Sequence, residues 1–127
     1  MQSKEGVVRG LHGQRHPYQQ AKQVYCTRGR IRDVVVDPSN WTVWTFDLCP
    51  SEGVYVPANM LHGYSSLEQS EVIYLVDKEY CPEEEWGINP LDSSLQIDWG
   101  YKKPEMSEKD RKLPDLCDWM TAEGHLS

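Results

Sequence analysis

The stretch from residue 21 to residue 48, AKQVYCTRGRIRDVVVDPSNWTVWTFDL, decides the fold. It contains three short runs rich in Val, Thr, Tyr and Trp, a composition typical of β-strands. Arg28-Gly29 predicts a hairpin turn between the first two runs, and Pro38-Ser39-Asn40 predicts the next turn. We therefore expect three consecutive strands, at residues 21–27, 31–37 and 41–48.

Similar runs continue on both sides of this stretch, at residues 6–12, 53–56, 71–76 and 95–99. No segment before the C-terminal third shows sustained helical periodicity, and Ser107 resembles the N-cap of one short helix. Many short strands with turn signals at close spacing indicate an antiparallel sandwich or barrel. We expect an all-β fold, a cupin-like jelly roll or double-stranded β-helix barrel, forming a single domain over residues 1–127.

Composition narrows the possible partners. The 127 residues carry a formal net charge of -7, which argues against nucleic acid or an anionic membrane as the main partner. No apolar run approaches the length of a membrane span, and no signal peptide precedes the first polar residues. The four cysteines are scattered without a C-x-x-C pair, so we expect reduced thiols and a cytoplasmic protein.

Two segments next to predicted strands contain histidine: RGLH, which ends at His12, and VPANMLHG, which contains His62. Side chains at such positions can point into the mouth of a barrel, where binding sites of these folds lie. Lys22, Tyr74 and Asp110 are further polar candidates. Taken singly, each has an ordinary structural interpretation. Lys22 fits a solvated strand residue, Tyr74 a core residue with a satisfied hydroxyl, and Asp110 a carboxylate at a helix start.

The sequence Pro57-x-Asn59-x-x-His62 is close to the second motif of metal cupins, P-x-G-x-x-H. The other half of such a metal site is a His-x-His pair with a following Glu, whereas His12 and His16 are separated by three residues. We therefore expect a cupin without metal, because three convergent ligands cannot be named.

Read together, these segments resemble the dTDP-4-dehydrorhamnose 3,5-epimerase family. GVVRGLH at residues 6–12 is similar to the family's G-V-L-R-G-L-H, and Gln20-Ala21-Lys22 to its Q-A/G-K. Residues 56–64 correspond to I-P-x-G-F-A-H-G-F, with Tyr64 at the final position. Residues 28–37 resemble the hairpin G-x-I-x-D-V-x-V-D, Tyr74 and Tyr80 the paired tyrosines, and residues 106–110 the motif L-S-x-K/R-D.

The resemblance implies a cofactor-free epimerase acting on a nucleotide-linked 4-keto-6-deoxy sugar, with dTDP as the nucleotide. His12 would be the general base, oriented by Asp110. Lys22 would stabilise the enolate oxygen, and Tyr74 would return a proton on the opposite face of the ring. The substrate-binding residues implied by the same motifs are Arg9 and Lys109 for the diphosphate, Tyr80 for the base, His62 for the sugar, and Gln20.

The chain also departs from the family pattern. It starts close to the first motif, where the family carries an extra N-terminal section that helps build a dimer, and Gly13 replaces an aromatic residue. We still expect a homodimer, since an exposed-edge sandwich of this size gains from pairing. Two alternative functions stay open: a sugar-nucleotide binding protein without catalysis, and a metal-dependent cupin enzyme using His12 and His62.

One feature of the first motif conflicts with a shared pocket. Strict alternation along a strand places Arg9 and His12 on opposite faces. Gly10 lies between them, and a bulge at this glycine would bring both side chains to one side.

Overall fold

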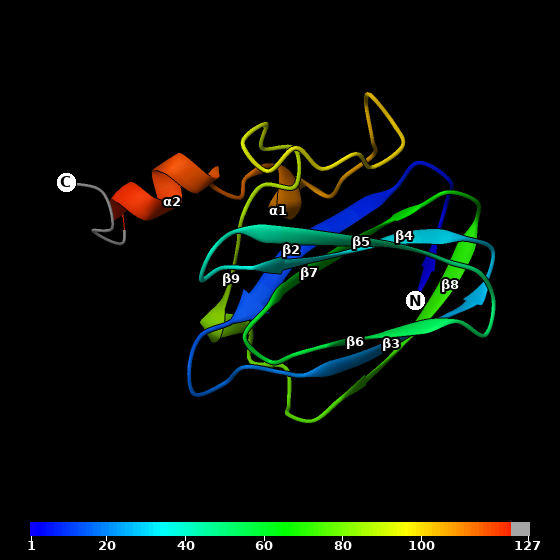
Figure 1. The fold of residues 1–127 in the computed structure, drawn as a ribbon, viewed down its shortest axis with the longest axis horizontal. Coiled ribbons are helices and arrows are strands. Elements are labelled where there is room, and N and C mark those ends of the chain that lie inside the picture. Colours follow the sequence, from blue (N-terminus) through cyan, green and yellow to red (C-terminus); the bar gives the residue numbers. More distant parts are fainter. Residues whose placement is uncertain (123–127) are drawn as a thin grey trace.

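Two antiparallel β-sheets packed face to face make up the body of the protein in the computed structural model, which describes residues 1–122 (Figure 1). The all-β prediction is confirmed, and the arrangement is a jelly roll. The four-stranded sheet runs β1 (Gln2–Ser3), β8 (Ser70–Val76), β3 (Lys22–Arg28), β6 (Gly53–Val56). The five-stranded sheet runs β5 (Thr42–Leu48), β4 (Ile31–Asp37), β7 (Leu61–Ser66), β2 (Val8–Gln14), β9 (Glu85–Gly87).

Strand β4 is buried on both faces, which explains its unbroken apolar run. Val35 points between the sheets, into a cluster with Val24, Val56 and Val72 of the other sheet. Val34 and Val36 point the opposite way and pack beneath the chain segment 88–106. A strand covered on both sides carries apolar residues at successive positions instead of alternating with polar ones.

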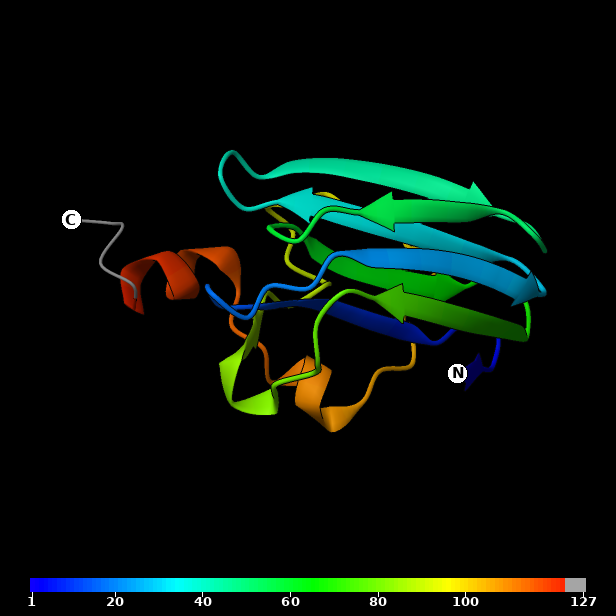
Figure 2. The same cartoon turned by 90° about the horizontal axis from the view of Figure 1, so that it is seen from below.

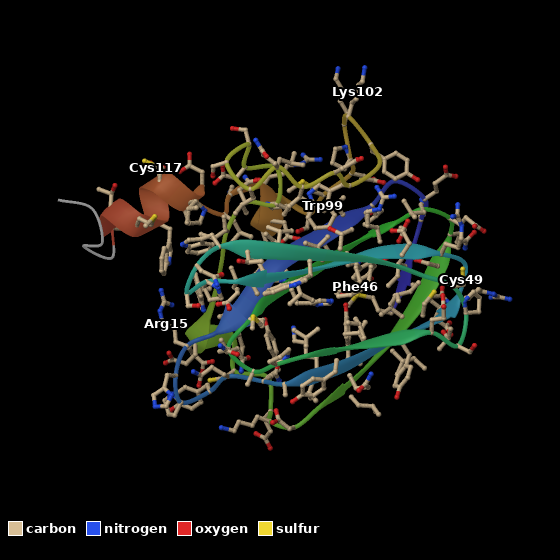
Figure 3. All side chains as sticks on the ribbon, in the orientation of Figure 1. Arg15, Phe46, Cys49, Trp99, Lys102 and Cys117 are labelled. Atoms are coloured by element: carbon tan, nitrogen blue, oxygen red, sulfur yellow. The ribbon has the colours of Figure 1, made fainter. Side chains whose placement is uncertain are left out.

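The predicted strand at residues 95–99 is wrong. These residues form turn and extended backbone without ladder pairing, yet Leu95 and Trp99 are buried in the cluster that covers the five-stranded sheet. Figure 3 shows Trp99 over this sheet, on the side of the C-terminal segments. Leu95 and Trp99 are apolar because they cover the five-stranded sheet, and they do not belong to a strand.

The turn at Arg28-Gly29 is real, but the predicted hairpin is wrong. Strand β3 pairs with β6 and β8, whereas β4 pairs with β5 and β7, so the turn carries the chain from one sheet to the other. Figure 1 shows the two sheets edge-on, and Figure 2 looks onto the face of the four-stranded sheet, with the five-stranded sheet behind it. By contrast, Pro38-Ser39-Asn40 does join a paired hairpin, β4 with β5, as predicted.

Strand β7 escaped prediction although all six of its residues are buried. Its sequence, LHGYSS, is mostly polar and resembles a loop. Each polar side chain has a partner: His62 with Asp33, Tyr64 with Ser3, Ser65 with the backbone oxygen of Trp99, and Ser66 with Ser70. Tertiary hydrogen bonds therefore stabilise a polar strand in the centre of the sheet.

Helix α1 (Glu108–Arg111) begins as predicted, with the Ser107 hydroxyl accepting a hydrogen bond from the backbone N–H of Asp110. A second helix, α2 (Leu116–Ala122), and a short 3-10 turn, η1 (Pro82–Glu84), were not predicted. Trp119 anchors α2 by stacking on Trp86, with ring centroids 4.8 Å apart. Across residues 1–122, no helix combines the length and apolar composition that crossing a bilayer needs.

Candidate active site

A pocket of about 440 Å³ opens between the two sheets, next to helix α1. It draws side chains from both sheets and from the helix. Most of the residues singled out from the sequence line it: Arg9, His12, Lys22, His62, Tyr74, Tyr80, Lys109 and Asp110.

Arg9 and His12 share this pocket because the strand between them is irregular. The pairing of β2 with β7 changes register between these two residues, as the bulge hypothesis requires. Gly10 has φ +123°, and a Cβ atom there would lie 2.6 Å from Cα of Gly63. The irregular backbone and the close approach of β7 both need glycine at this position.

His12 and Asp110 form a hydrogen-bonded pair at the edge of the pocket, with Nε2 of His12 2.6 Å from Oδ1 of Asp110. The other oxygen, Oδ2, accepts a hydrogen bond from the backbone N–H of Gly10 at 3.1 Å. Burial is the largest single influence on Asp110 and opposes its ionisation. The hydrogen bond and charge of His12, with the backbone N–H of Gly10 and the charge of Lys109, together outweigh burial and lower the pKa of the carboxyl below its ordinary value. A carboxylate bound to Nε2–H leaves Nδ1 of His12 able to accept a proton.

A second histidine–carboxylate pair lies deeper, with Nε2 of His62 2.6 Å from Oδ2 of Asp33. Asp33 has 0% exposure, and its Oδ1 has no hydrogen-bond partner among the described residues. Sequence reasoning missed Asp33, although a charged residue inside the buried run IRDVVVD was a usable signal, since buried carboxylates are rare unless paired. The pair fixes the orientation of the His62 ring behind Tyr74, with ring centroids 6.0 Å apart.

Lys22 and Tyr74 face His12 from the four-stranded sheet. The Lys22 ammonium lies 5.9 Å from the centroid of the Tyr74 ring. Burial lowers the pKa of Lys22 from its ordinary value, while the carboxylates of Glu85 and Asp33 partly oppose this shift. Burial also raises the pKa of Tyr74 well above its ordinary value. Tyr74 is therefore a protonated phenol at neutral pH, and can act as a proton donor.

The rim of the pocket is more open and carries charge. Lys109 forms an ion pair with Glu85, and this pair, chiefly through its hydrogen bond, raises the pKa of Lys109. Tyr80 stands beside them with 57% of its surface exposed, so one face of its ring is available for stacking. Glu85 was not among the residues predicted from the sequence.

Gln20 is the one predicted binding residue that the pocket does not include. Its side-chain amide donates a hydrogen bond to the backbone oxygen of Lys78 at 2.6 Å. This contact joins the entry of β3 to the loop after β8 and gives Gln20 a structural role, and its contact with substrate stays a prediction.

Within residues 1–122, no group of three or more His, Cys, Asp or Glu side chains is arranged to hold a metal ion. Both pocket histidines direct Nε2 to a carboxylate, and these carboxylates lie on different elements. No observation in the described part of the chain favours the metal-dependent alternative.

Comparison with known proteins agrees with this geometry. Residues 1–118 match the family model described as dTDP-4-dehydrorhamnose 3,5-epimerase. The chain belongs to the dTDP-4-dehydrorhamnose 3,5-epimerase family. A family member from Streptomyces griseus is 36% identical over 125 residues, which cover 91% of this chain and 62% of the relative. The chain thus spans less than two thirds of the length of that curated relative.

Solved structures extend the comparison to the fold. An epimerase of Mycobacterium tuberculosis superposes with a TM-score of 0.88 at 34% identity, covering 99% of this chain and 68% of the other. A 3'-monoepimerase from Streptomyces bikiniensis, solved in complex with dTDP-quinovose, gives a TM-score of 0.88 at 31% identity, covering 99% and 68%. The cupin-like jelly roll expected from the sequence is therefore confirmed.

Proposed function

We propose that this member of the family is an epimerase that inverts C3, C5 or both centres of a nucleotide-linked 4-keto-6-deoxy sugar. The observation that carries the proposal is the placement of His12 and Tyr74 on opposite sheets, facing one pocket. Inversion needs a base on one face of the sugar ring and an acid on the other. A pocket walled by the two sheets supports that arrangement.

Each step follows from the chemistry of the side chains. The C4 ketone acidifies the protons on C3 and C5, and Nδ1 of His12 removes one while Asp110 stabilises the imidazolium. The electron pair moves to the C4 oxygen, where the Lys22 ammonium stabilises the enolate. Tyr74 then delivers a proton from the opposite side, and the ketone reforms. The substrate carries its own electron sink, so the sequence of steps uses no cofactor.

The rim supports a nucleoside diphosphate as the handle of the substrate. Tyr80 offers a flat face to a base, and Arg9 and Lys109 offer positive charge to a diphosphate. A related enzyme from Bacillus anthracis was solved with TDP and PPi bound, and the Streptomyces bikiniensis enzyme with a dTDP-sugar. We therefore propose dTDP as the nucleotide.

We also propose a homodimer. The outer face of the four-stranded sheet exposes four large apolar side chains on its three longer strands: Tyr25, Tyr55, Ile73 and Leu75. A contiguous apolar face of this kind is typical of an interface. The four cysteines are free, which supports a reducing compartment such as the cytoplasm.

Proton NMR of dTDP-4-keto-6-deoxyglucose incubated with the protein in deuterium oxide tests the activity directly. Deuterium at C3, C5 or both is the expected result and defines which centres react. Binding of dTDP by a folded protein without any exchange would contradict the epimerase and favour the non-catalytic binding protein.

A further inference from the structure

Gln14, the last residue of β2, has a buried side chain that lies outside the lining of the pocket. It is 6% exposed and is paired with Glu85 of β9. The pairing of β2 with β9 is regular from His12 onward, so Gln14 lies on the same face of the strand as His12. Because a buried amide needs hydrogen-bond partners, those partners indicate what Gln14 does.

The partners of the Gln14 amide lie on either side of a single residue. Its Oε1 accepts a hydrogen bond from the backbone N–H of Cys81 at 2.7 Å. Its Nε2 donates to the backbone oxygen of Tyr18 at 2.5 Å and, at 3.4 Å, to that of Glu79. Tyr80 is the one residue between Glu79 and Cys81. The amide therefore holds the backbone on both sides of Tyr80.

A second glutamine binds the same loop. Residues 77–81 follow β8 without forming a helix or strand, and segment 14–21 leads from the end of β2 to the start of β3. Besides the contacts of Gln14, the amide of Gln20 in this segment donates to the backbone oxygen of Lys78 at 2.6 Å. The segment that joins the strand of the proposed base to the strand of the proposed enolate-stabilising lysine therefore also holds the loop at the pocket rim.

The ring of Tyr80 gains from a fixed backbone because its own packing is loose. It lines the pocket but is 57% exposed, so few neighbouring side chains restrict it. A group that becomes ordered only when a ligand binds lowers the affinity, and a group that is ordered beforehand does not. Hydrogen bonds that fix the loop in advance therefore favour stacking of a base on Tyr80.

We propose that Gln14 is a positioning residue for Tyr80: its amide fixes the backbone on both sides of the tyrosine, so that the ring is held at the rim to stack on the nucleotide base. This inference rests on the proposed function. Gln14 acts through Tyr80, so it contributes to binding of the base and not to proton transfer. Binding of the diphosphate depends instead on Arg9 and Lys109.

Gln14→Met tests this role, because methionine is similarly long and unbranched but lacks the amide donor and acceptor. The net contribution of one hydrogen bond corresponds to roughly 2- to 10-fold in affinity, so calorimetric titration should show dTDP bound more weakly by about that factor. Inorganic pyrophosphate, which is bound beside TDP in the related Bacillus anthracis structure, has no base and should bind the variant as tightly as the wild type. Gln69→Met, at an exposed glutamine outside the pocket lining, is the control.

Two results of these titrations would overturn the proposal. One is unchanged affinity of Gln14→Met for dTDP. The other is equal weakening of dTDP and pyrophosphate, because a general loss of structure affects both probes.

A double-mutant cycle tests whether Gln14 acts through the ring of Tyr80. Tyr80→Ala removes the stacking surface and should weaken dTDP binding by roughly 5- to 150-fold. Adding Gln14→Met to Tyr80→Ala should then cause no further loss, because the ring that Gln14 positions is absent. Fully additive effects of the two substitutions would contradict the proposal.

A measurement without nucleotide separates this proposal from the proposed function. In ¹⁵N NMR of Gln14→Met, the backbone N–H of Cys81 should lose protection from hydrogen exchange, because its acceptor is gone. Unchanged protection of this N–H would overturn the role of Gln14 whatever the affinity for dTDP. Lost protection in a variant of a protein whose wild type binds neither dTDP nor pyrophosphate would retain the fixed loop and reject the proposed nucleotide.

Discussion

Asp110 accepts one hydrogen bond from Nε2 of His12 at 2.6 Å and a second from the backbone N–H of Gly10 at 3.1 Å. One carboxylate thereby holds both the imidazole and the irregular backbone two residues before it. The carboxylate itself is fixed by helix α1, whose N-cap Ser107 binds the backbone N–H of Asp110. Asp110 thus connects the His12–Asp110 dyad to the bulge of β2 at Gly10.

Asp110→Asn should lower kcat by about 100-fold or more, within the usual range of a general base. The neutral amide has no negative charge to stabilise the His12 imidazolium. The ring would then lose its preferred tautomer. Single-turnover kinetics measure the change, and Asp118→Asn on the exposed side of α2 is the control. A kcat within twofold of wild type would remove Asp110 from the dyad.

His12→Ala should abolish exchange at the sugar carbon while dTDP binding persists, because the base is lost and the charged rim is intact. Deuterium incorporation and calorimetric titration with dTDP measure the two properties. His16→Ala, an exposed histidine outside the pocket lining, is the control. Persistent exchange at the wild-type rate would show that another group is the base.

Tyr74→Phe should reduce net inversion by about 100-fold, the usual contribution of a general acid, while some exchange of the abstracted proton continues. The phenol hydroxyl is the proposed proton donor, and the ring alone cannot replace it. Product analysis by NMR separates the two rates, with Tyr25→Phe as the control. Full inversion in Tyr74→Phe would contradict the assignment.

The rate should fall at alkaline pH as Lys22 loses its charge. Burial lowers the pKa of this ammonium, so the loss sets in at a lower pH than the ordinary lysine value of about 10.4. The Lys22→Arg variant keeps its positive charge at every accessible pH. Its kcat should therefore begin to fall at a higher pH than that of the wild type, even if its maximal kcat is lower. Identical alkaline limbs in both proteins would show that another group titrates there.

Ile73→Lys should convert the proposed dimer to a monomer, because it places a charge in the apolar outer face of the four-stranded sheet, where Ile73 is 47% exposed. Analytical ultracentrifugation over a concentration series measures the association. Leu91→Lys, at an exposed leucine outside the strands, is the control and should remain dimeric. A wild-type chain that stays monomeric throughout the series would contradict the dimer.

The sequence predicted what depends on short-range patterns. Strands β4 and β6 have the predicted bounds, and the Ser107 cap starts a helix, because strand composition and capping are local properties. The motifs also named most residues of the pocket, since each motif keeps its side chains at a fixed place on its own strand.

Only the tertiary structure decided which strands pair and which buried polar groups meet. The turn at Arg28-Gly29 looks the same whether it closes a hairpin or passes between sheets, so pairing had to be observed. Strand β7 resembled a loop because its polar residues depend on partners far away in the sequence, as in Tyr64 with Ser3. The same reason hid Asp33. A buried polar side chain is stabilised by a partner that lies far away in the sequence, and the local sequence does not show which residue that partner is.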